Sequence, residues 1–457
     1  QYTSMLENLI VEGANFVWGT PLLIVLLGGG IFFAIYSRFL PFKYFKHSID
    51  IIRGKYDEKH SAGQISHFEA LSGHLAATIG MGNISGVAVA IATGGPGAIF
   101  WMWVSAFFGV ATKFFTCSLA VMYRGKDSAG VMQGGPMYVI KEGLGKKYMP
   151  LAYFFAITCF FGMTPIFQTN QIVQVFNDVV MQPNGWVGED VFMNNLIQGV
   201  VIAILVAVVI FGGIKRIGAV AGKMVPFMVI IYVASVLYIM LINYTQILPT
   251  LGLIITDAFT AEAALGGAVG ALIITGARRA AFSNEAGIGT APMMHGAAKT
   301  DEPIREGLVA MIGPVVDTII VCTMTGLAIL ITGVWQTTES NGITLTAQAF
   351  EMAMPGFGPY ILVICVLTFA FTTLFGLAYY GRKCLAFMVG VKWSFLFNYW
   401  TIILILIGSV SSLAVVVSFV DMVYGLMAFP TMISAVLLAP KVMEATKVYF
   451  QKMNSGK

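Results

Sequence analysis

Long apolar runs separated by short polar segments dominate the hydrophobic pattern of this chain. A helix needs about 20 apolar residues to cross the hydrocarbon core of a bilayer, and on that scale the pattern predicts eleven membrane-spanning helices. Their approximate bounds are 16–37, 68–94, 97–122, 150–179, 192–212, 218–242, 263–292, 306–334, 358–380, 393–412 and 415–439. The chain is therefore predicted to be an all-α, multi-pass membrane protein that forms one domain over residues 1–457.

Composition narrows the class of protein further. Of the 457 residues, 58% are hydrophobic and 11% are charged, which lies outside the range of soluble globular domains. Glu7 and Glu12 precede the first apolar run without a basic segment, so we expect this run to remain as a helix rather than to be cleaved as a signal peptide. The sequence shows no zinc-type Cys/His spacing, phosphate-binding loop, nucleic-acid module or nucleophile–base pair. We therefore expect a lipid bilayer as a partner, no nucleic acid, and no enzyme.

The basic residues predict how the helices are oriented. All but one of the 26 Lys and Arg residues lie in or beside alternate connections and in the C-terminal tail, as the positive-inside rule requires if the N-terminus is outside and the C-terminus inside. The exception, Lys113, is close enough to the inner end of the third helix for its ammonium group to snorkel. The outer segments 243–262 and 335–357 are long enough to hold short helices, and the inner loop 38–67 either lies on the membrane surface or is an ordinary solvated loop.

The sequence Gly80-Met81-Gly82-Asn83 falls near the middle of the second helix. Glycines in membrane helices commonly serve close helix packing, but Asn83 needs polar partners, and Thr78 and Gly86 extend the same unusual stretch. Non-helical backbone at this depth is tolerated only where it lines a cavity or is buried in protein. We therefore predict that the helix is interrupted here.

The seventh helix has a related property. Thr275-Gly276-Ala277 lies about a dozen residues from its expected outer end and precedes two arginines, so we predict a second interruption at this point. Another candidate, 285–289, lies too far inward for the middle of the membrane. Interrupted helices at corresponding positions of two halves are typical of inverted-repeat transporters, and the halves would be residues 68–242 and 263–439, with 16–37 as an extra N-terminal helix.

Such interruptions offer backbone groups as ligands. The N–H groups of Met81 and Gly82 would face a carboxylate at the start of the outer half-helix, assisted by the helix dipole. The carbonyl groups of Ala76, Thr78 and Ile79 are hard oxygen ligands for a small cation such as Na⁺. An anionic group and Na⁺ are thus predicted to bind side by side.

The fourth helix carries a polar face. Thr164, Gln168, Gln171 and Gln174 recur at helical spacing and must face the protein interior. Gln168, near mid-depth, is predicted to contact the amino or carboxylate group of a substrate. Phe167 beside it either closes over the substrate side chain or is ordinary core.

With these residues in view, the chain resembles the alanine or glycine:cation symporter family, the AgcS-type sodium:amino acid symporters of the APC superfamily, which have a LeuT-type fold. The resemblance covers nearly the whole chain. It rests on 80–83 (GMGN), 94–103 (GGPGAIFWMW), 133–138 (QGGPMY), 282–292 (FSNEAGIGTAP) and 317–318 (DT). It implies a five-plus-five inverted repeat formed by helices 2–6 and 7–11.

The resemblance also implies site residues. The predicted substrate-binding residues are Thr78, Ile79, Gly80, Met81, Gly82, Asn83, Phe167, Gln168, Thr275 and Gly276. The predicted sodium ligands are Ala76, Ile79, Phe369, Thr372 and Thr373, although the two threonine hydroxyls could merely bond to their own helix. A second sodium site would use Thr78, Asn83, Thr275 and Asp317; alternatively, Asp317 could pair with Arg278 or Arg279.

The resulting prediction is sodium-coupled symport of small neutral amino acids, alanine or glycine, into the cell by alternating access. Sodium is expected as the co-transported ion, and the protein is expected to be a monomer in the plasma membrane of a prokaryote. Proton-coupled uptake, and an amino-acid-gated channel or sensor, are the alternatives.

Overall fold

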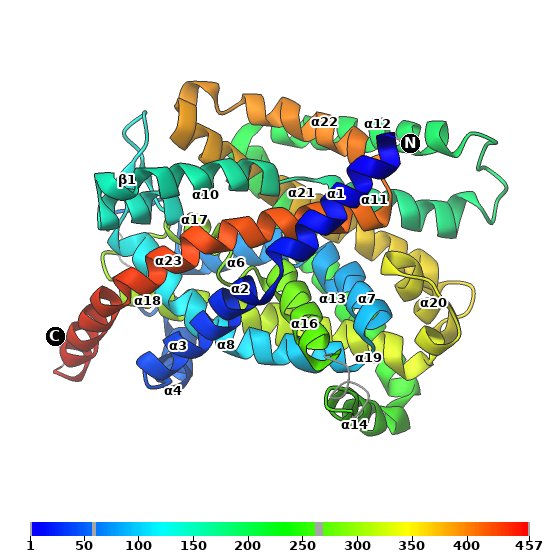
Figure 1. Cartoon of the computed structure of the whole chain (residues 1–457), viewed down its shortest axis with the longest axis horizontal. Helices are drawn as coiled ribbons and strands as arrows, with labels where there is room; N and C mark the ends of the chain where they lie inside the picture. Colours follow the sequence, from blue (N-terminus) through cyan, green and yellow to red (C-terminus); the bar gives the residue numbers. More distant parts are fainter. Residues whose placement is uncertain (1, 57–60, 261–267, 456–457) are drawn as a thin grey trace.

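The computed structural model describes residues 2–56, 61–260 and 268–455, which are almost entirely helical. Many of the long helices run along the longest axis of the molecule, and the two termini lie at opposite ends (Figure 1). Within the described residues, seven helices are long and apolar enough to cross a membrane, or ten if each of three bent helix pairs counts as one crossing. The remaining predicted crossing, 263–292, falls partly on residues 261–267, outside the described ranges.

The first half of the chain follows the predicted order of helices. Its elements are α1 (Tyr2–Val17), α2 (Thr20–Leu23), η1 (Ile24–Gly28), α3 (Gly29–Tyr36), α4 (Leu40–Lys43), α5 (Phe45–Ile52), α6 (His67–Thr78), α7 (Met81–Gly94), α8 (Gly97–Met122), α9 (Pro136–Tyr138), η2 (Val139–Leu144), η3 (Lys146–Tyr148), α10 (Met149–Gly162), α11 (Ile166–Phe176), η4 (Asn177–Met181), α12 (Val191–Ile210), α13 (Gly213–Ile242), η5 (Tyr244–Gln246) and α14 (Ile247–Asp257). The short strands β1 (Gly125–Lys126) and β2 (Met132–Gln133) pair antiparallel.

The second half of the chain also follows the predicted order of helices. Its elements are α16 (Ala268–Asn284), α17 (Thr290–His295), α18 (Pro303–Ala310), η6 (Val315–Cys322), α19 (Thr323–Thr332), η7 (Val334–Gln336), α20 (Gly342–Ala353), α21 (Gly358–Val389), η8 (Val391–Trp393), α22 (Leu396–Val410) and α23 (Leu413–Asn454). Helix α8 is largely buried and packs against α3, α16 and α18.

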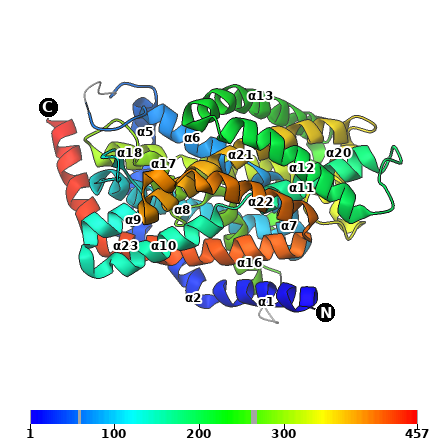
Figure 2. The ribbon, with the colours of Figure 1, turned by 90° about the horizontal axis from the view of Figure 1, so that it is seen from above.

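Several elements in or next to the connections predicted to be inside lie toward one end of the molecule. Figure 1 places α4, α18 and β1 toward the end that holds the C-terminus, and Figure 2 places α5 there as well. Helices α14 and α20 occupy the two segments that we expected to hold short helices, and they lie toward the other end (Figure 1). Helix α23 continues well past the predicted end at residue 439.

Two interruptions confirm or extend the sequence prediction. Helices α6 and α7 are bent by 45° relative to each other at Ile79–Gly80, so the predicted break in the second crossing is confirmed. The fourth crossing, predicted as one helix over 150–179, is instead interrupted between α10 and α11. Pro165 explains this break, because proline lacks an N–H donor and disfavours helical geometry in the residue before it.

The predicted interruption at Thr275–Ala277 is wrong. Helix α16 runs without a break from Ala268 to Asn284, and the chain leaves helical geometry at 285–289, the candidate that we judged too far inward. The hydroxyl of Thr275 donates to the Ala271 carbonyl at 2.9 Å within its own helix. Gly276 is a packing glycine, because a Cβ there would lie 2.9 Å from the carbonyl oxygen of Ala98 in α8.

Replacing Gly276 with alanine is expected to lower the free energy of unfolding by about 1–3 kcal/mol, since the added methyl would overlap Trp101 in a close-packed contact. Denaturant-induced unfolding in mixed micelles measures this change in the free energy of unfolding. Gly270 is the matched control on the same helix, because a Cβ there meets no atom of the described residues within 4 Å. Equal stability of the two alanine variants would contradict the packing role.

Candidate functional site

The break between α6 and α7 is held open by a side chain. Gly80 has φ −159° and ψ −144°, and its N–H donates to Oδ1 of Asn83 at 2.9 Å instead of continuing the helix to the Ala76 carbonyl. The N–H of Asn83 donates in return to the Gly80 carbonyl at 3.1 Å. Ala76 thereby loses its helical donor, and α7 begins with the N–H groups of Met81 and Gly82.

Helix α21 crosses directly at this break. A Cβ on Gly80 would overlap Oγ1 of Thr373, and a Cβ on Gly376 would lie 2.9 Å from Cα of Ala77. Only glycine permits backbones to approach so closely. The structure therefore brings the predicted sodium ligands of the second crossing next to those of α21.

The threonine hydroxyls of α21 bond to their own helix, as the alternative prediction stated. Thr372 and Thr373 donate to the Phe369 carbonyl at 2.9 and 3.0 Å. A hydroxyl has one donor and two acceptor lone pairs. Its oxygen therefore keeps lone pairs that a cation can use while its hydrogen stays on the helix.

The second break lies beside the first. Asn83 of α7 donates through Nδ2 to Oγ of Ser283 at 3.3 Å and to the backbone carbonyl of Asp317 at 3.0 Å. After α16, Glu285 adopts a positive φ of 56°, and Gly287 and Gly289 follow with φ of 82° and 112°. The two interruptions therefore meet through a network of buried polar groups.

Asp317 belongs to this network. Its Oδ1 accepts from Ser283 and, at 3.2 Å, from Thr318, whereas its Oδ2 is buried and has no hydrogen-bond partner among the described residues. The predicted alternative, a pair between Asp317 and an arginine, is wrong. Arg279 and, at 3.8 Å, Arg278 pair with Asp421 of α23.

Two glutamines on the polar face of α11 differ in their hydrogen bonds. Oε1 of Gln171 accepts from Ser85 and from the Ile343 N–H, so this side chain joins helices. Oε1 of Gln168 is buried and has no partner within the described ranges. Gln168 therefore has a buried acceptor that its surroundings, as described, leave unused.

Two aromatic rings, those of Phe167 and Phe282, pack together beside the start of α7. Phe167 is fully buried and packs edge-on against Phe282, with ring centroids 4.9 Å apart. Phe282 also packs over Gly82 and Gly86 of α7. The sequence prediction did not include Phe282, although it lies in the SNEAG-containing segment.

Thr275 and Gly276 do not reach the break. Thr275 packs beside Gly94 at the far end of α7, and the distance from Gly80 to Gly94 along a helix is about 20 Å at about 1.5 Å per residue. The structure therefore places both residues outside the candidate site, and it separates Thr275 from the other predicted ligands of the second sodium site.

Lys113 does not snorkel. Its side chain is 1% exposed, and Nζ contacts Nε2 of His74, whose Nδ1 lies 3.2 Å from the hydroxyl of Tyr380. Glu285 accepts from Thr290 and from Tyr424. Lys113 and Glu285 are two further polar side chains of this centre, and each has a partner distant in sequence.

Within the described residues, no group of His, Cys, Asp and Glu could hold a tightly bound metal ion. Backbone groups and hydroxyls instead gather where two membrane helices are interrupted side by side. This arrangement defines a secondary transporter of the broken-helix class.

The comparisons with known proteins give the family. The model of the sodium:alanine symporter family matches residues 3–457, and the chain belongs to this family. It is 40% identical to an uncharacterized transporter of Haemophilus influenzae, over 98% of this chain and 97% of that protein. It is 41% identical to the sodium/alanine symporter AgcS of Methanococcus maripaludis, over 95% of each chain. It is 34% identical to the probable sodium/glutamine symporter GlnT of Bacillus subtilis, over 99% of this chain and 92% of that protein.

Family membership confirms the resemblance seen in the sequence. The chain is a multi-pass membrane protein of a sodium-coupled amino acid symporter family, which is a family of transporters and not of enzymes.

Proposed function

We propose that this protein carries alanine or glycine, together with Na⁺, into a prokaryotic cell across the plasma membrane by alternating access. The contact between the helix break at Gly80 and Thr373 of α21 is the observation that carries the proposal, because it sets carbonyl and hydroxyl oxygens beside the N-terminal N–H groups of α7. The protein acts as a monomer, with its N-terminus outside and its C-terminus inside. Its core is the inverted repeat of residues 68–242 and 263–439.

The substrate carboxylate binds the N–H groups of Met81 and Gly82, and Gln168 contacts the same amino acid. Na⁺ binds next to the carboxylate through oxygens of Ala76, Ile79, Phe369, Thr372 and Thr373. A carboxylate close to the cation makes each ligand favour the binding of the other, which is the coupling that symport needs. The edge-on packing of Phe167 and Phe282 favours a small substrate.

Burial supports alternating access. Asn83, Phe167, Gln168, Phe369 and Thr373 are all buried, so a ligand reaches the site only if the surrounding helices move. Inward movement of one Na⁺ gains about 2.3 kcal/mol per 100 mV of membrane potential, before any concentration gradient contributes.

Uptake into proteoliposomes tests this function. We expect radiolabelled alanine to accumulate above its external concentration with an inward Na⁺ gradient, and to stop accumulating when K⁺ replaces Na⁺. A proton gradient that replaces Na⁺ fully would favour the proton-coupled alternative. Alanine binding without accumulation would favour a sensor, and equilibration without accumulation would favour a channel.

A further inference from the structure

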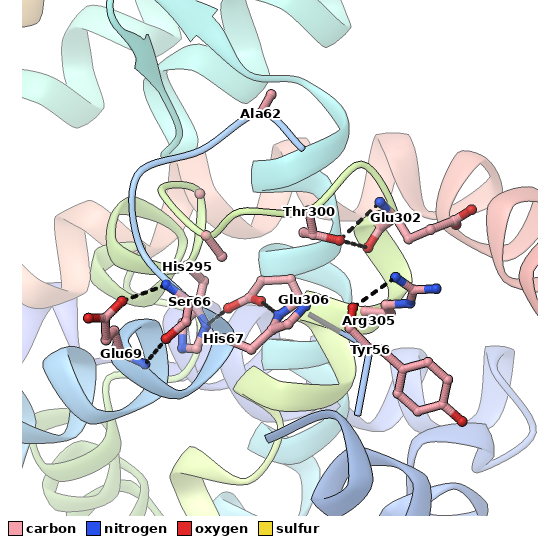
Figure 3. Close-up of polar contacts among 12 residues, drawn as sticks. Tyr56, Ala62, Ser66, His67, Glu69, His295, Thr300, Glu302, Arg305 and Glu306 are labelled. Atoms are coloured by element: carbon pink, nitrogen blue, oxygen red, sulfur yellow. Dashed lines mark hydrogen bonds and ion pairs between the residues drawn. The ribbon is translucent and has the colours of Figure 1, made fainter. Parts of the chain in front are cut away.

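Two histidines and one glutamate meet in a buried cluster away from the candidate site. His295 ends α17, His67 begins α6, and Glu306 lies on α18 (Figure 3). Nδ1 of His295 lies 2.5 Å from Oε1 of Glu306, and Nδ1 of His67 contacts Oε2. The three side chains are at most 1% exposed.

The cluster joins the inner parts of both interrupted crossings. Helix α6 is the half of the second crossing that ends at the break, and α17 is the helix that follows the break after α16. The backbone strengthens the same junction, since the N–H of Gln64 donates to the Ala297 carbonyl at 2.7 Å and the N–H of Lys299 to the Ile65 carbonyl at 2.6 Å. The junction therefore holds the helix before the first break next to the helix after the second break.

Hydrogen bonding indicates the protonation state of the cluster. Both Nδ1 atoms face one carboxylate, so both carry hydrogen and donate to Glu306. Both Nε2 atoms, on His67 and His295, are buried and have no hydrogen-bond partner among the described residues. A neutral Nε2 leaves one buried acceptor unpaired, whereas a protonated Nε2–H would be a buried cationic donor without an acceptor, which costs more.

The surroundings also disfavour a further positive charge. The guanidinium of Arg124 interacts with Glu306 and donates to the carbonyl groups of Gly296 and Ala298, which follow His295. The rings of His74 and His295 have centroids 5.7 Å apart, and His74 in turn contacts Lys113. Other titratable groups on the elements around the cluster are Glu69, Cys117, Lys299, Asp301, Glu302, Arg305 and Lys383.

We propose that His67, Glu306 and His295 form a proton-binding site that closes the inner end of the transporter, and that protonation of either imidazole at Nε2 opens it. The proposal rests on the alternating access proposed above. A proton added to the closed cluster brings a buried, unpartnered N–H, and the open arrangement exposes the same N–H to water. Acidification of the inner side therefore shifts the population toward the inward-open state.

The rate at which Cys117 reacts with a thiol reagent measures this opening, and the measurement does not depend on transport. Cys117 is one of five cysteines, all free and buried, and it packs between Ala291 of α17 and Ala310 of α18. In a variant that keeps only Cys117, an impermeant maleimide is applied to inside-out vesicles. The labelling rate is compared between the intact cluster and the His67→Gln/His295→Gln variant at each pH, because the ratio cancels the intrinsic pH dependence of thiol reactivity.

The expected result is a ratio that rises about fivefold from about pH 8 to about pH 6. A ratio that stays constant would overturn the proposal. His47→Gln is the matched control, since His47 bonds to Tyr449 at 2.7 Å outside the cluster, and it should keep the full pH response. If the double variant does not fold, Glu306→Gln takes its place in the comparison, and this substitution should also abolish the pH response.

Transport failure is distinguishable from failure of this proposal. If no Na⁺-dependent alanine uptake is found at any pH, the proposed function fails, but the labelling of Cys117 still shows whether the cluster controls access. If uptake is found and labelling does not respond to the cluster, only the proton-binding proposal fails.

Discussion

Replacing Thr373 with alanine is expected to raise the Na⁺ concentration for half-maximal alanine uptake by about 10-fold or more. The hydroxyl of Thr373 lies where the break at Gly80 meets α21, and the substitution removes one of the proposed oxygen ligands of Na⁺. Interactions of a polar group with a charge are worth about 1.5–3 kcal/mol, which corresponds to about 10- to 150-fold in affinity. The Na⁺ dependence of initial uptake rates in proteoliposomes measures this change.

Two variants make the result specific. Thr368 lies on the same helix, and its hydroxyl donates to the Ile364 and Cys365 carbonyls at 3.0 and 2.8 Å, so Thr368→Ala should leave the Na⁺ dependence unchanged. Thr373→Ser keeps the hydroxyl and should retain most of the affinity. An unaltered Na⁺ dependence in Thr373→Ala would remove Thr373 from the sodium site.

The break in the second crossing was predictable because several signals coincide there. Two glycines weaken the helix, Asn83 demands polar partners, and the charge distribution places the sequence near mid-depth. The structure shows that Asn83 itself supplies the interruption, by accepting the N–H of Gly80. Local sequence contained the chemistry of this break, and only the donor and acceptor pairing had to come from the structure.

The second break could not be located in the same way. Gly276 in a membrane helix indicates either an interruption or a close neighbour, and the neighbour, Trp101 of α8, is distant in sequence. The true break is marked by Glu285, whose positive φ is stabilised by contacts with Thr290 and Tyr424.

Long-range charge partners were also beyond a single sequence. His67 and Glu306 are 239 residues apart, and Arg279 and Asp421 are 142 residues apart. An arginine in an apolar helix shows that a partner is needed, but several acids satisfy that need equally well until the packing of α16 against α23 is known. Sequence therefore predicted that the charges must be paired and did not predict with which residue.

The pair between Arg279 and Asp421 leads to the largest expected effect on stability. Both side chains are 3% exposed, and Asp421 also attracts Arg278 at 3.8 Å. Asp421→Asn leaves buried guanidinium charge without its carboxylate. Removal of one partner of a buried ion pair costs about 3–5 kcal/mol, so unfolding in mixed micelles should occur at a markedly lower denaturant concentration, and the yield of folded protein should fall.

An exposed pair on the same helix shows whether burial is the cause. Lys441 and Glu444 lie 3.4 Å apart with side chains 61% and 70% exposed, and Glu444→Gln should change stability by less than about 1 kcal/mol. The double variant Arg279→Met/Asp421→Leu removes both charges and should recover part of the loss, because two apolar side chains require no partner. If Asp421→Asn is as stable as Glu444→Gln, the arginines are compensated elsewhere, and the contact of α16 with α23 does not depend on charge.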